Sequence, residues 1–410
     1  MSVEVITFGC RLNAYESEAI KARVSGLENA VIVNTCAVTA EAVRQSRQQI
    51  RKLRRERPHA RIIVTGCAAQ TEPETYSMMG EVDLVLGNGE KLDSGFYFGA
   101  NERVIVNDIM SIKETASAFL EGFEGRARAF LQIQNGCDHR CTFCIIPYGR
   151  GNSRSVGMGA VVAEARRLAE NGYGEIVLTG VDLTSYGADL PGKPTLGALV
   201  TKILKFVPEL KRLRLSSIDS IEADEELLRA IAEEERLMPH FHLSAQSGDD
   251  LILKRMKRRH KRADTIAFCT RVRNLRPEAA FGADLIAGFP TETEDMFQNT
   301  LRLVDDAGLS MLHVFPFSAR ARTPAALMPQ VPRSEVRRRA ARLRHKGNEA
   351  FSNRHASLIG TLQTLLVEAT GVGRTACYAP VRFSGITLDT FVRVRITAAA
   401  GGHLIGDVLS

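Results

Sequence analysis

Tryptophan is absent from the sequence, and aromatic residues make up only 6% of its 410 residues. A platform of aromatic side chains on which successive bases could stack is therefore not evident. The sequence also lacks an apolar stretch long enough to span a bilayer, and its first residues contain neither the basic nor the apolar segment of a secretory signal. We therefore expect a cytoplasmic protein with no membrane partner.

Eight cysteines without a secretory signal favour metal binding or catalysis over disulfides. The net charge of +7 favours a polyanionic partner, although composition alone does not name nucleic acid. Three basic runs, at residues 41–57, 254–262 and 333–346, suit contacts to phosphates. A charge run is more often a solvated helix face, so each run on its own is weak evidence.

Three of the cysteines, Cys137, Cys141 and Cys144, follow the spacing C-x3-C-x2-C directly after a β-rich run at residues 130–134. Three thiolates suit an iron–sulfur cluster in which one iron is left unclaimed by the protein and can bind a substrate. The alternative is a structural zinc site, which is normally closed by a fourth Cys or His. His139 is poorly placed for that role because it lies between two of the ligands, so the spacing favours the cluster.

Three further cysteines share another placement. Residues 3–8, 30–35 and 61–66 are short β-branched runs separated by helix-like segments, which predicts a parallel βαβαβ sheet. At the end of each run stands a cysteine: Cys10, Cys36 and Cys67. Because ligands gather at the carboxyl ends of parallel strands, these thiols can converge into a second three-thiolate site. The alternative is that each is a small buried apolar residue.

A second βα series begins after a boundary near residue 120. Its six strand-like runs lie at residues 128–134, 175–178, 212–215, 240–243, 281–286 and 311–315. Alternation with amphipathic helices predicts a (β/α)6 partial barrel, with its functional residues on the loops that follow the strands. The candidates for binding a small polar ligand across that mouth are Thr179, Gly180, Ser216, Gln246 and Asp284. Each residue alone is explained equally well by turn chemistry.

The last sixty or so residues no longer alternate strand-like and helix-like segments. Alternating runs at 362–368, 391–396 and 403–409, separated by glycine-rich breaks, predict a small antiparallel β-barrel. The predicted fold class is therefore α/β: a parallel-sheet α/β domain, a partial TIM barrel and a C-terminal β-barrel. Cys269 and Cys377 match no ligand position and are interpreted as structural.

These residues resemble the radical S-adenosylmethionine enzymes and, within them, the methylthiotransferases. The first cysteine triplet with its aromatic Phe143 matches the radical motif, and the second triplet matches the auxiliary-cluster ligands of methylthiotransferases. The runs at 34–39 and 314–318 are similar to the branch that acts on threonylcarbamoyladenosine at position 37 of tRNA. The resemblance divides the chain into a methylthiotransferase N-terminal domain (1–120), a radical core (123–353) and an RNA-binding domain similar to the TRAM module (354–410).

The resemblance also implies the cofactors and partners. Two 4Fe–4S clusters would be held by the two triplets, with S-adenosylmethionine bound by Phe143 and the residues of the barrel mouth, and no catalytic side chain beyond the cluster ligands. The implied partners are tRNA and a one-electron reductant such as a flavodoxin. The implied RNA contacts are Arg374, Arg382, Arg393 and Arg395.

Other functions remain open at this point. A methylthiotransferase of the same fold could act on isopentenyladenosine in tRNA or on a ribosomal protein aspartate. Outside this class, the chain could be a non-catalytic iron–sulfur protein that binds RNA or transfers electrons. Any of the methylthiotransferases would cleave S-adenosylmethionine, whereas the non-catalytic protein would not.

Overall fold

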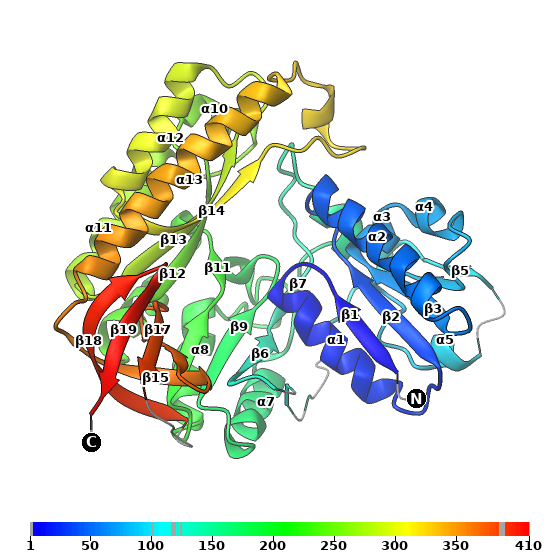
Figure 1. Cartoon of the computed structure of the whole chain (residues 1–410), viewed down its shortest axis with the longest axis horizontal. Helices are drawn as coiled ribbons and strands as arrows, with labels where there is room; N and C mark the ends of the chain where they lie inside the picture. Colours follow the sequence, from blue (N-terminus) through cyan, green and yellow to red (C-terminus); the bar gives the residue numbers. More distant parts are fainter. Residues whose placement is uncertain are drawn as a thin grey trace.

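The computed structural model describes residues 3–99, 102–115, 120, 122–123, 125–384 and 390–409. Figure 1 shows three parts in chain order: a sheet with its helices at the right, a large curved βα assembly at the left, and a small barrel below it. No helix in the described ranges is long and apolar enough to cross a membrane.

The first part is a five-stranded, fully parallel sheet whose spatial order follows the chain. Its strands are β1 (Glu4–Thr7), β2 (Ala30–Thr35), β3 (Arg61–Gly66), β4 (Leu84–Leu86) and β5 (Val104–Ile105). Its helices are α1 (Arg11–Arg23), α2 (Ala40–Glu56), α3 (Cys67–Thr71), α4 (Pro73–Ser77) and α5 (Gly95–Phe98). Helices α1 and α2 cover opposite faces, since Ile20 packs in one apolar cluster and Ile50 in the other.

The second part is the predicted partial barrel, and its strands all pair in parallel. They are β6 (Arg128–Gln132), β9 (Glu175–Thr179), β10 (Arg212–Leu215), β11 (Ser217–Ile218), β12 (His240–Gln246), β13 (Ala280–Ala287) and β14 (Leu309–Pro316). The third predicted strand is interrupted at Ser216: β10 pairs with β9, whereas β11 pairs with β12. The barrel is therefore six strands wide, as predicted, with β6 and β14 at its edges.

The long helices of this part cover the outer face of the barrel (Figure 1). The main ones are α7 (Met158–Glu170), α8 (Leu196–Phe206), α9 (Glu225–Glu233), α11 (Arg262–Leu275), α12 (Glu294–Asp306) and α13 (Arg333–Ala356). Phe241 of β12 packs outward, 6.5 Å from Phe268 of α11 between ring centroids. Because side chains alternate along a strand, His240 and His242 of the same strand point to the inner face. Polar residues on this inner face are therefore available to a ligand.

The C-terminal part is a closed barrel of β15 (Leu362–Ala369), β16 (Val372–Arg374), β17 (Pro380–Ser384), β19 (His403–Val408) and β18 (Phe391–Ala400). Four of its strand pairs are antiparallel, as predicted, and the pair β17–β19 is parallel. Its core is apolar, with Val381, Val394 and Leu404 buried together. The sequence predicted the three longer strands and missed β16 and β17, which have only three and five residues.

Candidate functional site

The loop that carries Cys137, Cys141 and Cys144 is fixed at several points. Gly136 has φ 72°, and a Cβ at this position would lie 1.8 Å from the carbonyl oxygen of Asn152, so only glycine fits. The backbone N–H of Cys137 donates to the carbonyl of Gly151 at 3.1 Å, and that of Thr142 to the carbonyl of Met256, also at 3.1 Å. The loop is thereby held both to its own continuation at Gly151 and to the segment after β12 that contains Met256.

The three thiols are close enough to affect each other's ionisation. Burial, followed by the negative charge of Asp182, raises the pKa of Cys137 above its usual value, and both other cysteines add to this effect. Burial likewise raises the pKa of Cys144 to about 12. Thiols with raised pKa values are deprotonated when a metal cation binds to the sulfur and displaces the proton. Three neighbouring thiolates fit the ligand set of an iron–sulfur cluster.

Arg258 is the cation next to this triplet. In the sequence it is one of several basic residues in the run 254–262. Its Nη1 lies 3.6 Å from Cys141 Sγ, while Nη2 donates to Asp219 Oδ2 at 2.5 Å and to the carbonyl oxygen of Ser244 at 3.0 Å. One buried guanidinium thus ties the cysteine loop to Asp219, directly after β11, and to Ser244 near the carboxyl end of β12. No sequence signal separates it from its basic neighbours.

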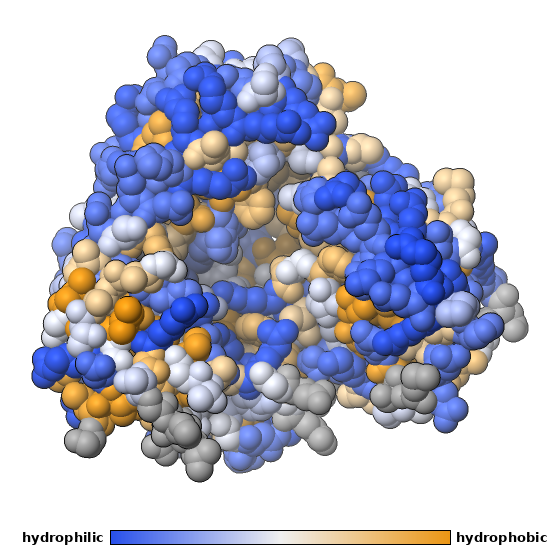
Figure 2. Space-filling model, viewed as in Figure 1, coloured by the Kyte–Doolittle hydropathy of each residue, from blue (hydrophilic) through white to orange (hydrophobic). Residues whose placement is uncertain are grey.

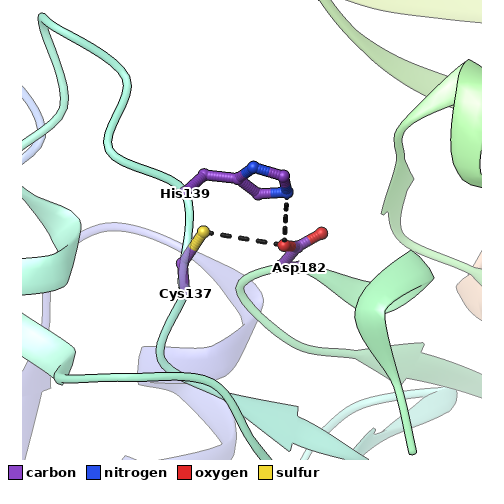
Figure 3. A group of neighbouring side chains, drawn as sticks. All are labelled: Cys137, His139 and Asp182. Atoms are coloured by element: carbon purple, nitrogen blue, oxygen red, sulfur yellow. Dashed lines mark hydrogen bonds and ion pairs between the residues drawn. The ribbon is translucent and has the colours of Figure 1, made fainter. Parts of the chain in front are cut away.

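Asp182, in the loop after β9, is the nearest carboxylate (Figure 3). Its Oδ2 lies 3.6 Å from Cys137 Sγ, 3.1 Å from His139 Nε2 and 2.8 Å from Ser185 Oγ. Burial raises the pKa of Asp182, but hydrogen bonds from His139 and Ser185 outweigh burial, and the pKa ends below its usual value. An ionised carboxylate therefore faces the mouth of the barrel. Cys137, His139 and Asp182 could together hold a metal ion, but that set omits two of the three thiols.

Apart from Asp284, the other predicted ligand-binding residues lie in the cysteine loop and at or beyond the carboxyl ends of different barrel strands. Phe143 packs edge-on against Phe289, with ring centroids 6.4 Å apart. Thr179 is buried, and a Cβ on Gly180 would lie 3.0 Å from Gln134. The hydroxyl of Ser216 is buried without a hydrogen-bond partner among the described residues, and Gln246 ends β12 with φ 64°. The orphaned hydroxyl is available to a bound ligand.

Asp284 is not at a strand end. It lies midway along β13 on the inner face, where Oδ1 accepts from His242 Nε2 at 2.8 Å and lies 3.2 Å from His313 Nδ1. Burial raises the pKa of Asp284, but the two imidazoles outweigh burial and hold it at about 2. Neither histidine could be singled out from the sequence, because their convergence depends on the pairing of three strands.

The cysteines of the N-terminal sheet also come together. Cys10 precedes α1, Cys36 follows β2, and Cys67 is the first residue of α3 after β3. Gly9, with φ 100°, allows close approach, because a Cβ there would lie 2.9 Å from Cys36 Sγ. Burial, and then the charges of Cys67 and Cys10, raise the pKa of Cys36 to about 12. The three strand ends therefore bring a second thiol triplet together.

A buried ionic network lies directly behind this second triplet. Arg150 donates to both carboxylate oxygens of Glu16, at 2.8 and 2.9 Å, and to Asn13 Oδ1 at 2.5 Å. Lys91 Nζ completes the network 2.6 Å from Glu16. Burial raises the pKa of Glu16, but Arg150 and Lys91 outweigh it and lower that pKa to about 2. Asn13 in turn accepts from the Cys10 thiol, at 3.9 Å.

One short helix connects the two triplets. Helix α6 (Ile146–Arg150) starts two residues after Cys144 and ends in Arg150. A Cβ on Gly149 of this helix would lie 3.4 Å from the Cβ of Cys67, and Asn88 donates to both the Gly149 carbonyl and the Cys67 thiol. At a rise of about 1.5 Å per residue, α6 covers roughly 7.5 Å. The helix that follows the first thiol triplet therefore packs directly against Cys67 of the second.

Most arginines of the basic runs are already paired. The pairs or hydrogen bonds are Arg44–Glu41, Arg54–Asp83, Arg57–Glu4, Arg255–Thr291, Arg262–Asp306, Arg338–Glu335, Arg339–Glu292 and Arg342–Glu294. Of the predicted RNA contacts, Arg374 is half-buried and pairs with Glu368 at 3.1 Å. Arg382, Arg393 and Arg395 are exposed on the outer faces of β17 and β18.

Comparison with known families identifies two segments of the chain. Residues 131–304 match the radical SAM superfamily, and residues 2–87 match a family described as "Uncharacterized protein family UPF0004". Among solved structures, the radical S-adenosylmethionine methyltransferase TsrM from Kitasatospora setae superposes with a TM-score of 0.53 at 16% identity, covering 77% of this chain and 67% of that one. That likeness shows a shared fold.

Sequence relatives extend over nearly the whole chain. The threonylcarbamoyladenosine tRNA methylthiotransferase MtaB of Rickettsia prowazekii is 55% identical, covering 92% of this chain and 90% of the relative. The protein of the same name in Thermotoga maritima is 34% identical, covering 96% and 94%. The tRNA-2-methylthio-N(6)-dimethylallyladenosine synthase of Erythrobacter litoralis is 32% identical, covering 99% and 96%.

Proposed function

The chain belongs to the family of threonylcarbamoyladenosine tRNA methylthiotransferases, and from this premise we propose that it attaches a methylthio group to C2 of threonylcarbamoyladenosine at position 37 of tRNA. The observation that supports this proposal best is that α6, which follows one cysteine triplet, packs against Cys67 of the other. A relative that acts on dimethylallyladenosine is 32% identical, against 55% for the threonylcarbamoyladenosine enzyme, which favours the latter substrate.

As a radical S-adenosylmethionine enzyme, the protein uses a 4Fe–4S cluster and S-adenosylmethionine. We assign that cluster to Cys137, Cys141 and Cys144, and a second 4Fe–4S cluster to Cys10, Cys36 and Cys67. When bound, these groups supply the radical that activates a C–H bond which no side-chain base could deprotonate, and the sulfur that replaces the hydrogen. The protein's part is to orient the reactants and to exclude water.

Residues around the first triplet have definable tasks in this proposal. Ionised Asp182 can accept hydrogen bonds from the ammonium group of S-adenosylmethionine, because His139 and Ser185 keep it charged. Arg258 fixes the cysteine loop through Cys141. Phe143, Thr179, Gly180, Ser216, Gln246 and Asp284 remain proposed cofactor contacts.

We further propose that residues 1–120, 123–353 and 354–410 act as the auxiliary-cluster, radical and RNA-binding domains. A tRNA substrate places the enzyme in the cytoplasm, and its radical chemistry requires a one-electron reductant such as a flavodoxin. Cys269 and Cys377 are buried outside both triplets, in keeping with structural roles.

Nucleoside analysis of cells lacking this protein tests the proposed function. We expect the methylthio form of threonylcarbamoyladenosine to disappear from tRNA and the unmethylthiolated nucleoside to rise, both measured by mass spectrometry of digested tRNA. Restoring the gene should restore the modified nucleoside. Loss of the methylthio form of isopentenyladenosine instead would assign the protein to the other branch.

The exposed arginines of the C-terminal barrel give a second prediction. Changing Arg382, Arg393 and Arg395 together to glutamine is expected to weaken tRNA binding and to reduce the slope of log affinity against log salt by roughly one per lost phosphate contact. Filter binding at several salt concentrations measures both quantities. Arg271→Gln is the control, since Arg271 of α11 is exposed but paired with Glu225 of α9. An unchanged salt slope in the triple variant would exclude this face as an RNA contact.

A further inference from the structure

Four arginines surround Tyr378 on the inner face of the partial barrel. Tyr378 leaves the C-terminal barrel between β16 and β17 with φ 72° and stacks on His240, with ring centroids 5.1 Å apart. The guanidinium carbons lie at these distances from its ring centroid: Arg11 at 5.7 Å, Arg128 at 5.3 Å, Arg214 at 4.8 Å and Arg374 at 4.4 Å. Four cations therefore converge on one aromatic ring.

Three of these four cations have carboxylate partners. Arg128 pairs with Glu175 at 2.9 Å, Arg214 pairs with Glu175 at 3.0 Å, and Arg374 pairs with Glu368 at 3.1 Å. Arg11 differs: it is half-buried, and within the described part of the chain it makes only the contact to the Tyr378 ring. A half-buried cation without a counter-charge favours the approach of an anion.

Arg11 is also placed between the second triplet and the inner face of the barrel. It is the first residue of α1 and directly follows Cys10. Its guanidinium lies over the ring of Tyr378, which stacks on His240 of the inner face, so it lies next to the inner-face residues. In Figure 1 the first turn of α1 points to the middle of the molecule, where Figure 2 shows the surface hollowed between the N-terminal sheet and the barrel.

The chemistry of the proposed substrate supplies the anion. A threonylcarbamoyl group on N6 of adenine carries the free carboxylate of its threonine. C2 and N6 belong to the same base, so when C2 faces the triplet that contains Cys10, the carboxylate extends from N6 on a short flexible arm on the same side of the ring as N1. A dimethylallyl group at the same position has no charge.

We propose that Arg11 binds the carboxylate of the threonylcarbamoyl group and thereby selects this base over adenines with an uncharged N6 substituent. This inference rests on the proposed function. A guanidinium can bind a carboxylate through two parallel hydrogen bonds, and Tyr378 holds the guanidinium in place from one side. Arg11 is thus a specificity-determining residue that contacts substrate.

The experiment compares two anticodon stem-loop RNAs. One carries threonylcarbamoyladenosine, and the other carries the same nucleoside with its carboxylate converted to a primary amide. The reconstituted full-length protein is measured for single-turnover methylthiolation and, separately, for equilibrium affinity by fluorescence anisotropy. We expect the wild type to prefer the acid over the amide by roughly 10- to 100-fold, the range of a charge-assisted hydrogen bond. In Arg11→Gln this ratio should fall to about one, and Arg11→Lys should keep part of it.

The control variant is Arg55→Gln, which removes an exposed arginine of α2 and should leave the acid-to-amide ratio unchanged. Equal losses for both RNAs in Arg11→Gln would overturn the inference, because a backbone phosphate contact or a structural role predicts that result. A wild type that modifies both RNAs equally well would also overturn it while leaving the proposed function intact. A wild type that modifies neither RNA would instead contradict the proposed function.

Discussion

Changing Cys36 to alanine is expected to leave cleavage of S-adenosylmethionine largely intact and to abolish transfer of the methylthio group to tRNA. Cys36 directly follows β2, beside Cys10 and Cys67, and so belongs to the triplet assigned to the second cluster. The measurement is 5′-deoxyadenosine and methylthio nucleoside formed by the anaerobically reconstituted, reduced protein. Iron content should fall from about eight per chain to about four, if each triplet holds a four-iron cluster.

Two further variants make this result specific. Cys141→Ala should abolish 5′-deoxyadenosine formation altogether, because Cys141 belongs to the triplet assigned to S-adenosylmethionine. Cys269→Ala removes an equally buried thiol that lies in neither triplet and should keep both products and all the iron. If Cys36→Ala blocked cleavage as completely as Cys141→Ala in a folded protein, the proposed division between the two sites would be wrong.

Both thiol triplets could be predicted from the sequence because each rests on a local pattern. Cys137, Cys141 and Cys144 share one loop, so their proximity follows from spacing alone. Cys10, Cys36 and Cys67 are far apart in sequence, yet each follows a β-branched run of a parallel sheet, and adjacent parallel strands bring their carboxyl ends together. The strands missed in this sheet, β4 and β5, have only three and two residues, too few to show a period.

The residues around the triplets could not be predicted in the same way. Arg258 and Arg150 look like any other arginine in a basic chain, and only the fold places one at 3.6 Å from Cys141 and the other on Glu16. The inner-face histidines depend on the register between β12, β13 and β14. The stacking of Tyr378 on His240 could not be predicted either, because it joins two residues that are far apart in the sequence.

Changing Arg150 to methionine is expected to lower the free energy of unfolding by about 3–5 kcal/mol, the usual cost of breaking a buried ion pair by removing one partner. The change leaves the Glu16 carboxylate buried with Lys91 alone, and it removes the hydrogen bond that Arg150 donates to Asn13 Oδ1. Arg150 and Glu16 side chains are each only 2% exposed, so water cannot replace the lost hydrogen bonds. Urea unfolding of the metal-free protein, followed by circular dichroism, measures the loss.

The comparison that isolates burial is Arg271→Met, which breaks the exposed pair with Glu225 and should cost no more than about 1 kcal/mol. Arg150→Lys should fall between the two, because it keeps the charge but cannot contact both Glu16 oxygens and Asn13 together. The unfolding midpoint of the N-terminal sheet should shift most, since Glu16 and Lys91 both belong to that part. If Arg150→Met were as mild as Arg271→Met, α6 would not be anchored by this network, and the close approach of the two triplets would need another cause.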